Sequence, residues 1–167
     1  MKRSGWLTSA LWVLAVQGAA TAACAASADE DQIRALQAKV AAAISAKDVD
    51  AIMTGYAPDV YVFDVVPPRA YVGKAAWRAD WAGVIKNTPG PMSLTVEDLA
   101  VSADGEIGYS HAIDHYVNTL ADGSKADMLI RASDVYRKID GRWLIVEEHL
   151  SVPVDLATGK PDLLSKP

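Results

Sequence analysis

Cysteine, phenylalanine and histidine are scarce in this chain, which holds one, one and three of them. The single cysteine, Cys24, lies near the N-terminus, so the rest of the chain offers no disulfide and no thiolate for catalysis or metal binding. The histidines, His111, His115 and His149, match no metal-ligand spacing. The sequence also has no glycine-rich phosphate loop, nucleophile elbow or dinucleotide fingerprint. These absences predict a function without a metal or another cofactor.

The N-terminus has the features of a secretory signal peptide. Lys2 and Arg3 precede an apolar stretch over residues 6–23, which polar residues interrupt too often for a membrane-spanning helix of about 20 residues. The small residues at 22–27 are typical of a cleavage site. We therefore expect a signal peptide over residues 1–26, a single mature domain over residues 27–167, and a periplasmic or secreted location.

Cys24 leaves one alternative open, because it could instead become the lipid-anchored first residue of a lipoprotein. Thr21 argues against this, since it stands where lipoproteins usually carry a large aliphatic residue. Unless Cys24 is lipidated, we expect no contact with a membrane. The net charge of −5 becomes more negative once Lys2 and Arg3 are removed, which argues against nucleic acid as a partner.

Hydrophobic periodicity predicts three helices in the first part of the mature chain. The first covers residues 33–44, with Ser27 and Glu30 available as a capping box. Asp48 is placed to cap a short second helix over residues 49–56, which Pro58 would close. The third helix covers residues 74–85.

Strands are predicted from β-branched and aromatic runs. One run, residues 60–66, lies between the second and third helices and stops at two prolines. Four more runs, at 93–102, 107–120, 126–138 and 142–152, are separated by three Asp-Gly pairs, a strong hairpin signal. The chain therefore predicts an α+β fold in which three N-terminal helices cover a curved antiparallel sheet and leave a cone with a pocket.

Several segments resemble SnoaL-like, ketosteroid isomerase-related proteins of the nuclear transport factor 2-like superfamily. The resemblance is carried by residues 61–68, 71–73, Arg131, 136–146, 149–155 and 158–160. It implies the same cone fold, a small-molecule ligand and a homodimer. The superfamily includes isomerases, cyclases, dehydratases, hydrolases, metal-independent carbonic anhydrases and non-catalytic association domains, so the resemblance does not define a reaction.

Two positions depart from the related sequences. The last strand usually reads His-Glu-His, whereas residues 147–149 read Glu-Glu-His. An Asn-Arg pair on the second strand of the meander is replaced by Asp114-His115. A role that needs two histidines on the last strand is therefore in doubt.

The turn at Asp140-Gly141 decides which side chains share a face of the sheet, since a shift of one residue exchanges the faces of a strand. A two-residue turn would place Ser133 opposite Glu148. A three-residue turn would place Ser133 opposite Glu147 and Arg131 opposite His149. We favour the second because it gathers the polar residues on one face.

This face defines a polar strip, which is the predicted ligand site. The polar strip consists of His111, Arg131, Ser133, Glu147 and His149. Arg131 would bind a carboxylate or carbonyl group, with His149 moving a proton and Glu147 acting as a base. Alternatively, Arg131 and Glu147 neutralise each other on a solvated face.

Three further residues complete the predicted site. Asp64 interrupts the first strand beside two prolines, where it would act either as a catalytic base or as an acceptor for loop amides. Tyr61 is a candidate donor to an oxyanion, and Trp81 a candidate wall of the cavity.

The predicted function is that of an exported small-molecule-binding protein. One hypothesis is a cofactor-free acid–base enzyme, an isomerase or a hydrolase or lyase, acting on a small carbonyl or carboxylate compound. The alternative is a non-catalytic ligand-binding or assembly module. A metal-independent carbonic anhydrase is a weaker alternative, since only His149-Leu150-Ser151 matches the motif of those enzymes.

Overall fold

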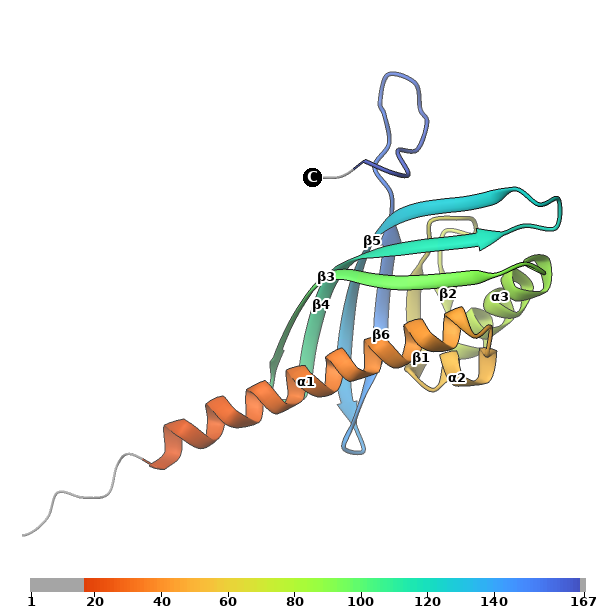
Figure 1. Cartoon of the computed structure of the whole chain (residues 1–167). Helices are drawn as coiled ribbons and strands as arrows, with labels where there is room; N and C mark the ends of the chain where they lie inside the picture. The colour runs from red at the N-terminus through yellow and green to blue at the C-terminus, as the bar shows by residue number, and fades with distance from the viewer. Residues whose placement is uncertain (1–16, 166–167) are drawn as a thin grey trace, which may run out of the picture.

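The computed structural model describes residues 17–165, which form three helices and six strands (Figure 1). The helices are α1 (Gln17–Ser45), α2 (Val49–Met53) and α3 (Lys74–Asn87). The strands are β1 (Tyr56–Phe63), β2 (Tyr71–Val72), β3 (Met92–Asp104), β4 (Ile107–Thr119), β5 (Lys125–Ile139) and β6 (Arg142–Ser151). This order confirms the predicted α+β class and the meander of four long strands, and it adds the two-residue strand β2.

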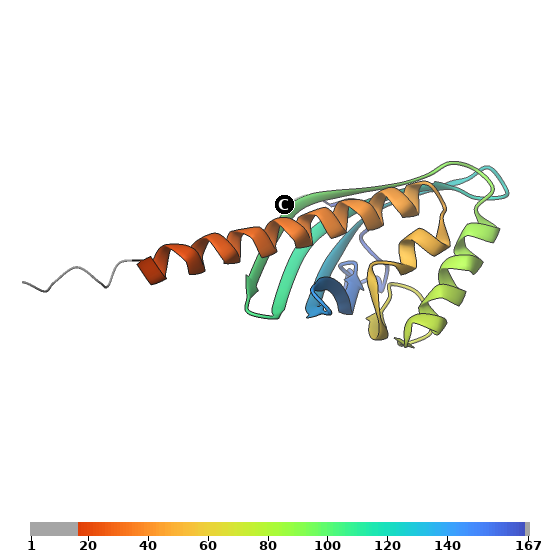
Figure 2. The same ribbon diagram turned by 90° about the horizontal axis from the view of Figure 1, so that it is seen from below.

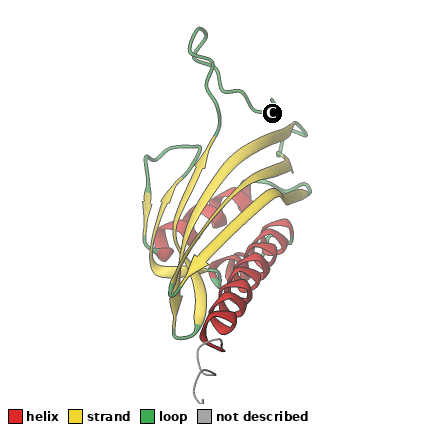
Figure 3. Ribbon diagram, turned by 90° about the vertical axis from the view of Figure 1, so that its left-hand side faces the viewer, coloured by secondary structure: helices red, strands yellow, loops and turns green. Residues whose placement is uncertain are grey.

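The strands form one sheet in the order β2-β1-β6-β5-β4-β3. All neighbouring strands are antiparallel except β1 and β6, which are parallel. Figures 2 and 3 show the sheet bent and unclosed, with the helices gathered on one of its sides. Three helices over a curved sheet are the predicted cone.

The two faces of the sheet differ sharply in burial, because successive side chains of a strand point to opposite faces. On β5, Ile130, Ala132 and Tyr136 are buried, whereas Arg131 and Ser133 are exposed. We call the buried side, which packs on the helices, the inner face, and the opposite side the outer face. Residues paired across neighbouring strands share a face, so this assignment extends over the whole sheet.

The core lies between the inner face and the helices. Ile33 of α1, Trp77 of α3, and Tyr136 and Ile145 of the sheet are almost completely buried. Gly108 allows α1 to approach β4 closely, because a Cβ atom there would lie only 2.6 Å from Cδ1 of Ile33. The small residue at this position therefore sets the distance between helix and sheet.

The predicted boundaries were wrong at two places. Helix α1 begins at Gln17, ahead of the predicted capping box at Ser27 and Glu30. The alanine-rich segment between Gln17 and Ser27 has high helix propensity, which extends the helix toward the N-terminus. Pro58 lies within β1 and does not close α2, which ends at Met53. The pairing of β1 with β6 is irregular between Tyr56 and Tyr61, and a proline without an N–H group is tolerated in such an interval.

Other local predictions are confirmed. Asp48 is the N-cap of α2 and accepts a hydrogen bond from the amide of Ala51 at 3.0 Å.

The first 16 residues of the predicted signal peptide lie outside the described residues. Among residues 17–165, no helix is long and apolar enough to cross a membrane.

Strand β6 reaches its register by a turn and a bulge. Ile139 pairs with Arg142, so the turn has two residues, Asp140 and Gly141, both with positive φ (49° and 74°). The pairing then shifts between Val135 and Tyr136, which leaves Val146 as an extra residue in β6. The predicted three-residue turn is therefore wrong.

Candidate functional site

A cavity of about 510 Å³ lies between the helices and the inner face of the sheet. Its walls come from α1, α3, the segment after β1, and strands β3 to β6. Trp77 and Trp81, one turn apart on α3, contact each other edge to face with ring centroids 5.7 Å apart. A volume of this size suits a small organic ligand.

Four carboxyl groups line the cavity among mostly apolar side chains. They belong to Asp64, Asp80, Asp114 and Glu148. No lysine, arginine or histidine is among the described residues of the lining. The cavity is therefore acidic, and burial disfavours the ionised forms of Asp64, Asp114 and Glu148.

Glu148 is the most buried of these acids, with 8% of its surface exposed. The phenol of Tyr56 donates to its two carboxyl oxygens at 3.1 and 3.2 Å. Burial raises the pKa of Glu148 well above its ordinary value, and the neighbouring Asp134 and Asp114 raise it further. Burial therefore favours the neutral, protonated form of Glu148, which can donate a proton or a hydrogen bond.

Asp134 lies behind Glu148, directly opposite it on β5. Its Oδ2 accepts hydrogen bonds from the side chains of Gln37 at 2.5 Å, Tyr136 at 3.1 Å and Ser110 at 3.3 Å. Burial raises the pKa of Asp134 to about 6, against the lowering effect of these donors. Among the described residues, three side chains donate to Asp134 and one donates to Glu148, so ionisation is easier at Asp134 than at Glu148.

Asp114 faces the cavity from β4, on the inner face with Tyr116. Burial, and then the charge of Asp134, raise its pKa to about 7. No hydrogen bond from residues 17–165 offsets this effect. A carboxyl group that faces a cavity and titrates near neutral pH is suited to both taking up and releasing a proton.

Asp64 accepts a loop amide, as one of its two predicted roles requires, and it also faces the cavity. Its Oδ1 accepts a hydrogen bond from the amide of Val65 at 2.7 Å, and the side chain lines the cavity. Burial raises its pKa to about 6, helped by the nearby Asp80. Asp80 itself accepts a hydrogen bond from the phenol of Tyr71 at 2.6 Å. Asp64 is thus a second candidate base.

The polar strip lies on the outer face and not in the cavity. His111 pairs with Ser133, and Ser133 pairs with His149, while Arg131 pairs with Ser151. Glu147 and His149 are exposed. These residues share one face, as predicted, but the bulge at Val146 produces this arrangement, and the helices cover the opposite face.

Tyr61 and Trp81, both predicted site residues, lie on opposite sides of the sheet. Tyr61 pairs with Glu147 on the outer face, whereas Trp81 lines the cavity. His149 packs against Phe63 on the outer face, with ring centroids 5.4 Å apart. Of the predicted site residues, only Asp64 and Trp81 therefore reach the cavity.

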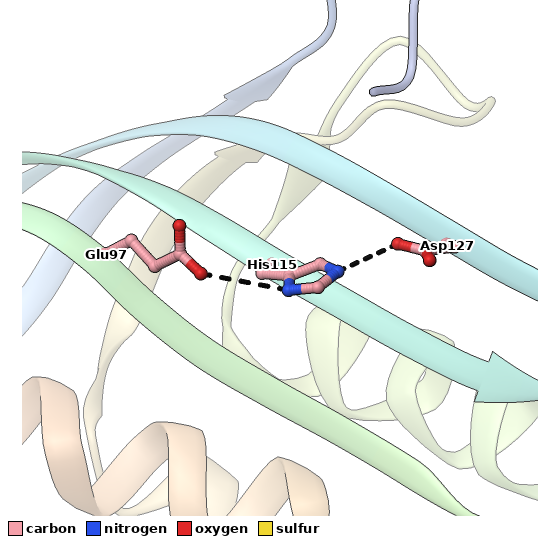
Figure 4. Close-up of polar contacts among 3 residues, drawn as sticks. All are labelled: Glu97, His115 and Asp127. Carbon is pink, nitrogen blue, oxygen red and sulfur yellow. Dashed lines mark hydrogen bonds and ion pairs between the residues drawn. The ribbon is translucent and has the colours of Figure 1, made fainter. Parts of the chain in front are cut away.

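The outer face carries one further polar cluster, which Figure 4 shows. His115 lies between two carboxylates: its Nε2 is 2.8 Å from Asp127 and its Nδ1 is 3.8 Å from Glu97. All three side chains are at least one-third exposed, so water screens the interaction. In the described part of the chain, no group of three or more His, Cys, Asp or Glu side chains is arranged to hold a metal ion.

Sequence reasoning missed the acids that line or support the cavity: Asp114, Asp134 and Glu148. A signal was present on β5, where the buried positions Ile130, Ala132 and Tyr136 alternate and Asp134 falls in the same series. An acid at a core position of a regular strand is a candidate functional residue.

The family model for the SnoaL-like domain matches residues 33–155. The chain belongs to the SnoaL-like domain family. This membership confirms the resemblance seen in the sequence, and the matched segment contains every residue of the cavity named above.

Solved structures of SnoaL-like relatives agree with this fold. An NTF2-like protein of unknown function from Pseudomonas putida KT2440 is 30% identical, with a TM-score of 0.77 over 84% of this chain and 98% of that one. A ketosteroid isomerase-like protein from Erwinia carotovora atroseptica SCRI1043 is 18% identical, with a TM-score of 0.64 over 74% of this chain and 95% of that one. The latter identity supports the fold alone. Among curated proteins, none matches the chain.

Proposed function

We propose that this protein is a cofactor-free acid–base enzyme that moves protons on a small, largely apolar carbonyl compound bound in the cavity. The observation that carries the proposal is that Asp114 and the buried Glu148 both line one largely apolar cavity. The pKa of Asp114 is raised to about 7, and burial raises the pKa of Glu148 well above its ordinary value. Two carboxyl groups whose environments give them different protonation states are what acid–base catalysis needs.

In the proposed mechanism, the carboxylate of Asp114 removes a proton from the carbon next to the carbonyl group. Electron density moves to the carbonyl oxygen, where the protonated Glu148 donates a hydrogen bond to the developing negative charge. Return of the proton from Asp114 to a different carbon completes an isomerisation. Loss of a hydroxyl group as water, with the proton supplied by Asp114, completes a dehydration.

The supporting residues keep Glu148 in its protonated form. Asp134 lies opposite it and stays the more readily ionised member of the pair. The lining has no cationic side chain among the described residues, so a carbonyl substrate is favoured over a carboxylate, which the ionised acids of the lining would repel. Asp64 is placed to act as a second base.

The experiment that tests this function needs no known substrate. A panel of small apolar ketones is incubated with the protein in D2O, and loss of the α-proton signals is followed by NMR. We expect exchange faster than in buffer, with the rate lowered by about 10²–10⁴-fold in Asp114→Asn. The matched control is Asp127→Asn on the outer face. Exchange that Asp114→Asn leaves unchanged would contradict the proposal.

A second candidate function, assembly through the outer face, rests on exposed apolar side chains. Tyr61, Val72, Ile107 and Tyr109 lie on that face and are 38–68% exposed. Such residues are more often found where a partner covers them, and a homodimer is the simplest assembly. Sedimentation should give a dimer for the wild type and a monomer for Tyr109→Lys. A monomeric wild type would exclude this candidate.

The proposal includes export. The basic residues Lys2 and Arg3, the apolar stretch that follows them and the small residues at 22–27 support a signal peptide that is cleaved near Ala26. The active protein would then be periplasmic or secreted.

A further inference from the structure

The acid lining of the cavity has a consequence for the charge of its ligand. Asp64, Asp80, Asp114 and Glu148 contribute four carboxyl groups, and the described lining contributes no lysine, arginine or histidine to balance them. In a largely apolar cavity, charges interact more strongly than in water. A bound cation would lower the energy of each ionised carboxylate there, whereas a bound anion would raise it.

The hydrogen-bonding capacity of Asn118 supplies a second, independent observation. Asn118 lines the cavity and is only 6% exposed. Its Nδ2 donates to the hydroxyl of Tyr116 at 3.0 Å and to that of Thr88 at 3.4 Å. Its Oδ1 has no partner among the described residues. A buried acceptor without a donor is costly, so a ligand that brings hydrogen-bond donors suits this wall.

Aromatic side chains line the same cavity. Trp77 and Trp81 come from α3, and Tyr116 lies two residues from Asp114 on the same face of β4. The faces of indole and phenol rings attract organic cations, and they also accept the apolar body of a ligand. The indole N–H groups of Trp77 and Trp81 find no acceptor within residues 17–165, but they are uncharged and do not balance the carboxylates.

We propose that the ligand of this cavity is an apolar molecule carrying a protonated amine, with the ammonium group next to Asp114. This inference rests on the proposed use of the cavity as the substrate site, and it narrows the substrate to an amino carbonyl compound. An ammonium group has donors and no acceptors, so it suits the carboxylates of the lining, while the Oδ1 of Asn118, four residues from Asp114 along β4, would meet a donor on another part of the ligand.

Three probes with nearly the same skeleton separate charge from shape: 2-phenylethylamine, 2-phenylethanol and phenylacetate. Binding of each to the full chain is measured at pH 8 by NMR titration of the indole N–H signals. We expect the amine to bind at least 10-fold more tightly than the alcohol, and the carboxylate to bind most weakly. Equal binding of amine and alcohol, tighter binding of the carboxylate, or no binding of the amine would each overturn the inference.

A matched pair of variants localises the effect. In Asp114→Asn, the preference for the amine over the alcohol should fall to below 3-fold, while Asp127→Asn, which removes a carboxylate from the outer face, should keep it. An unchanged preference in Asp114→Asn would show that the ammonium does not bind there. The titrations measure recognition of the ligand's charge, whereas the exchange assay in D2O measures proton transfer. The ligand proposal and the proposed function can therefore fail independently.

Discussion

Asp134 on β5 and Glu148 on β6 lie directly opposite each other, and more than nine-tenths of each residue's surface is buried. An ionised Asp134 disfavours ionisation of Glu148, the pKa of which burial already raises. Three donors around Asp134 make it the more readily ionised acid, whereas Glu148, with the phenol of Tyr56 beside it, is the acid that favours its protonated form. The following predictions test this division and its surroundings.

Glu148 should make the protein less stable as the pH rises. Its pKa is raised in the folded state, so the folded protein binds more protons than the unfolded chain above about pH 4.5. Stability is therefore fully present at low pH and lost as pH increases toward the folded pKa. Chemical denaturation at pH 5 and pH 8 should show that Glu148→Gln loses less stability than the wild type over this range.

The neighbouring Glu147 provides the control for that measurement. It has the same side chain but is exposed on the outer face. Glu147→Gln should follow the pH dependence of the wild type. If both variants behave alike, Glu148 is not held in its protonated form.

Asp114 should titrate near pH 7, since burial and Asp134 both raise its pKa. The carboxyl carbon signal of Asp114, followed by NMR from pH 4 to pH 9, gives this value directly. Asp134→Asn removes the repelling charge and should lower the pKa of Asp114. A midpoint near pH 4 in the wild type would mean that water reaches Asp114 freely.

Ligand binding should depend on the inner face and not on the polar strip. Trp81→Ala, which alters the wall of the cavity, should weaken binding of any cavity ligand by about 10-fold or more. Arg131→Ala and His149→Ala alter the outer face and should leave binding within about 2-fold. Weaker binding in Arg131→Ala and His149→Ala, with unchanged binding in Trp81→Ala, would show that the ligand binds at the polar strip.

Trp143 should be essential for stability, because it is 5% exposed and its indole N–H donates to Asp29 at 3.1 Å. Trp143→Ala should cost about 3–5 kcal/mol in thermal or denaturant unfolding. The matched control is Tyr109→Ala, which truncates an aromatic residue that is 57% exposed. We expect that variant to change stability by less than about 1 kcal/mol.

The mature protein should begin between Ala23 and Ala28 if the N-terminal segment is a signal peptide. Mass spectrometry of the protein purified from its native host measures this directly. Intact Met1 in cytoplasmic protein would contradict export.

The order of helices and strands was predictable because each element has a strong local signal. Asp48 before a short helix, the β-branched runs and the Asp-Gly pairs act within a few residues of the chain. Strand β2 was missed because two residues carry no periodicity. The start of α1 was missed because the alanine-rich segment before it has no apolar stripe, so only its helix propensity extends the helix.

The candidate site was predictable only in part. Arg131, Ser133, Glu147 and His149 do share one face, but the predicted turn was wrong, and the bulge at Val146 restores the grouping. Which face the helices cover depends on long-range packing, such as that of Ile33 on Gly108. Asp64 and Trp81 were found because they lie in elements that border the cavity on any such arrangement.

The bulge at Val146 makes the chemistry of the cavity depend on a single extra residue in β6. If Val146 paired with Val135 instead, the strand would advance by one residue and present Glu147 and His149 to the helices in place of Glu148 and Leu150. In evolution, gain or loss of this one irregularity would exchange an acidic, apolar lining for one that contains a histidine. Relatives whose sequences align without gaps along this strand can therefore differ in which side chains line the cavity.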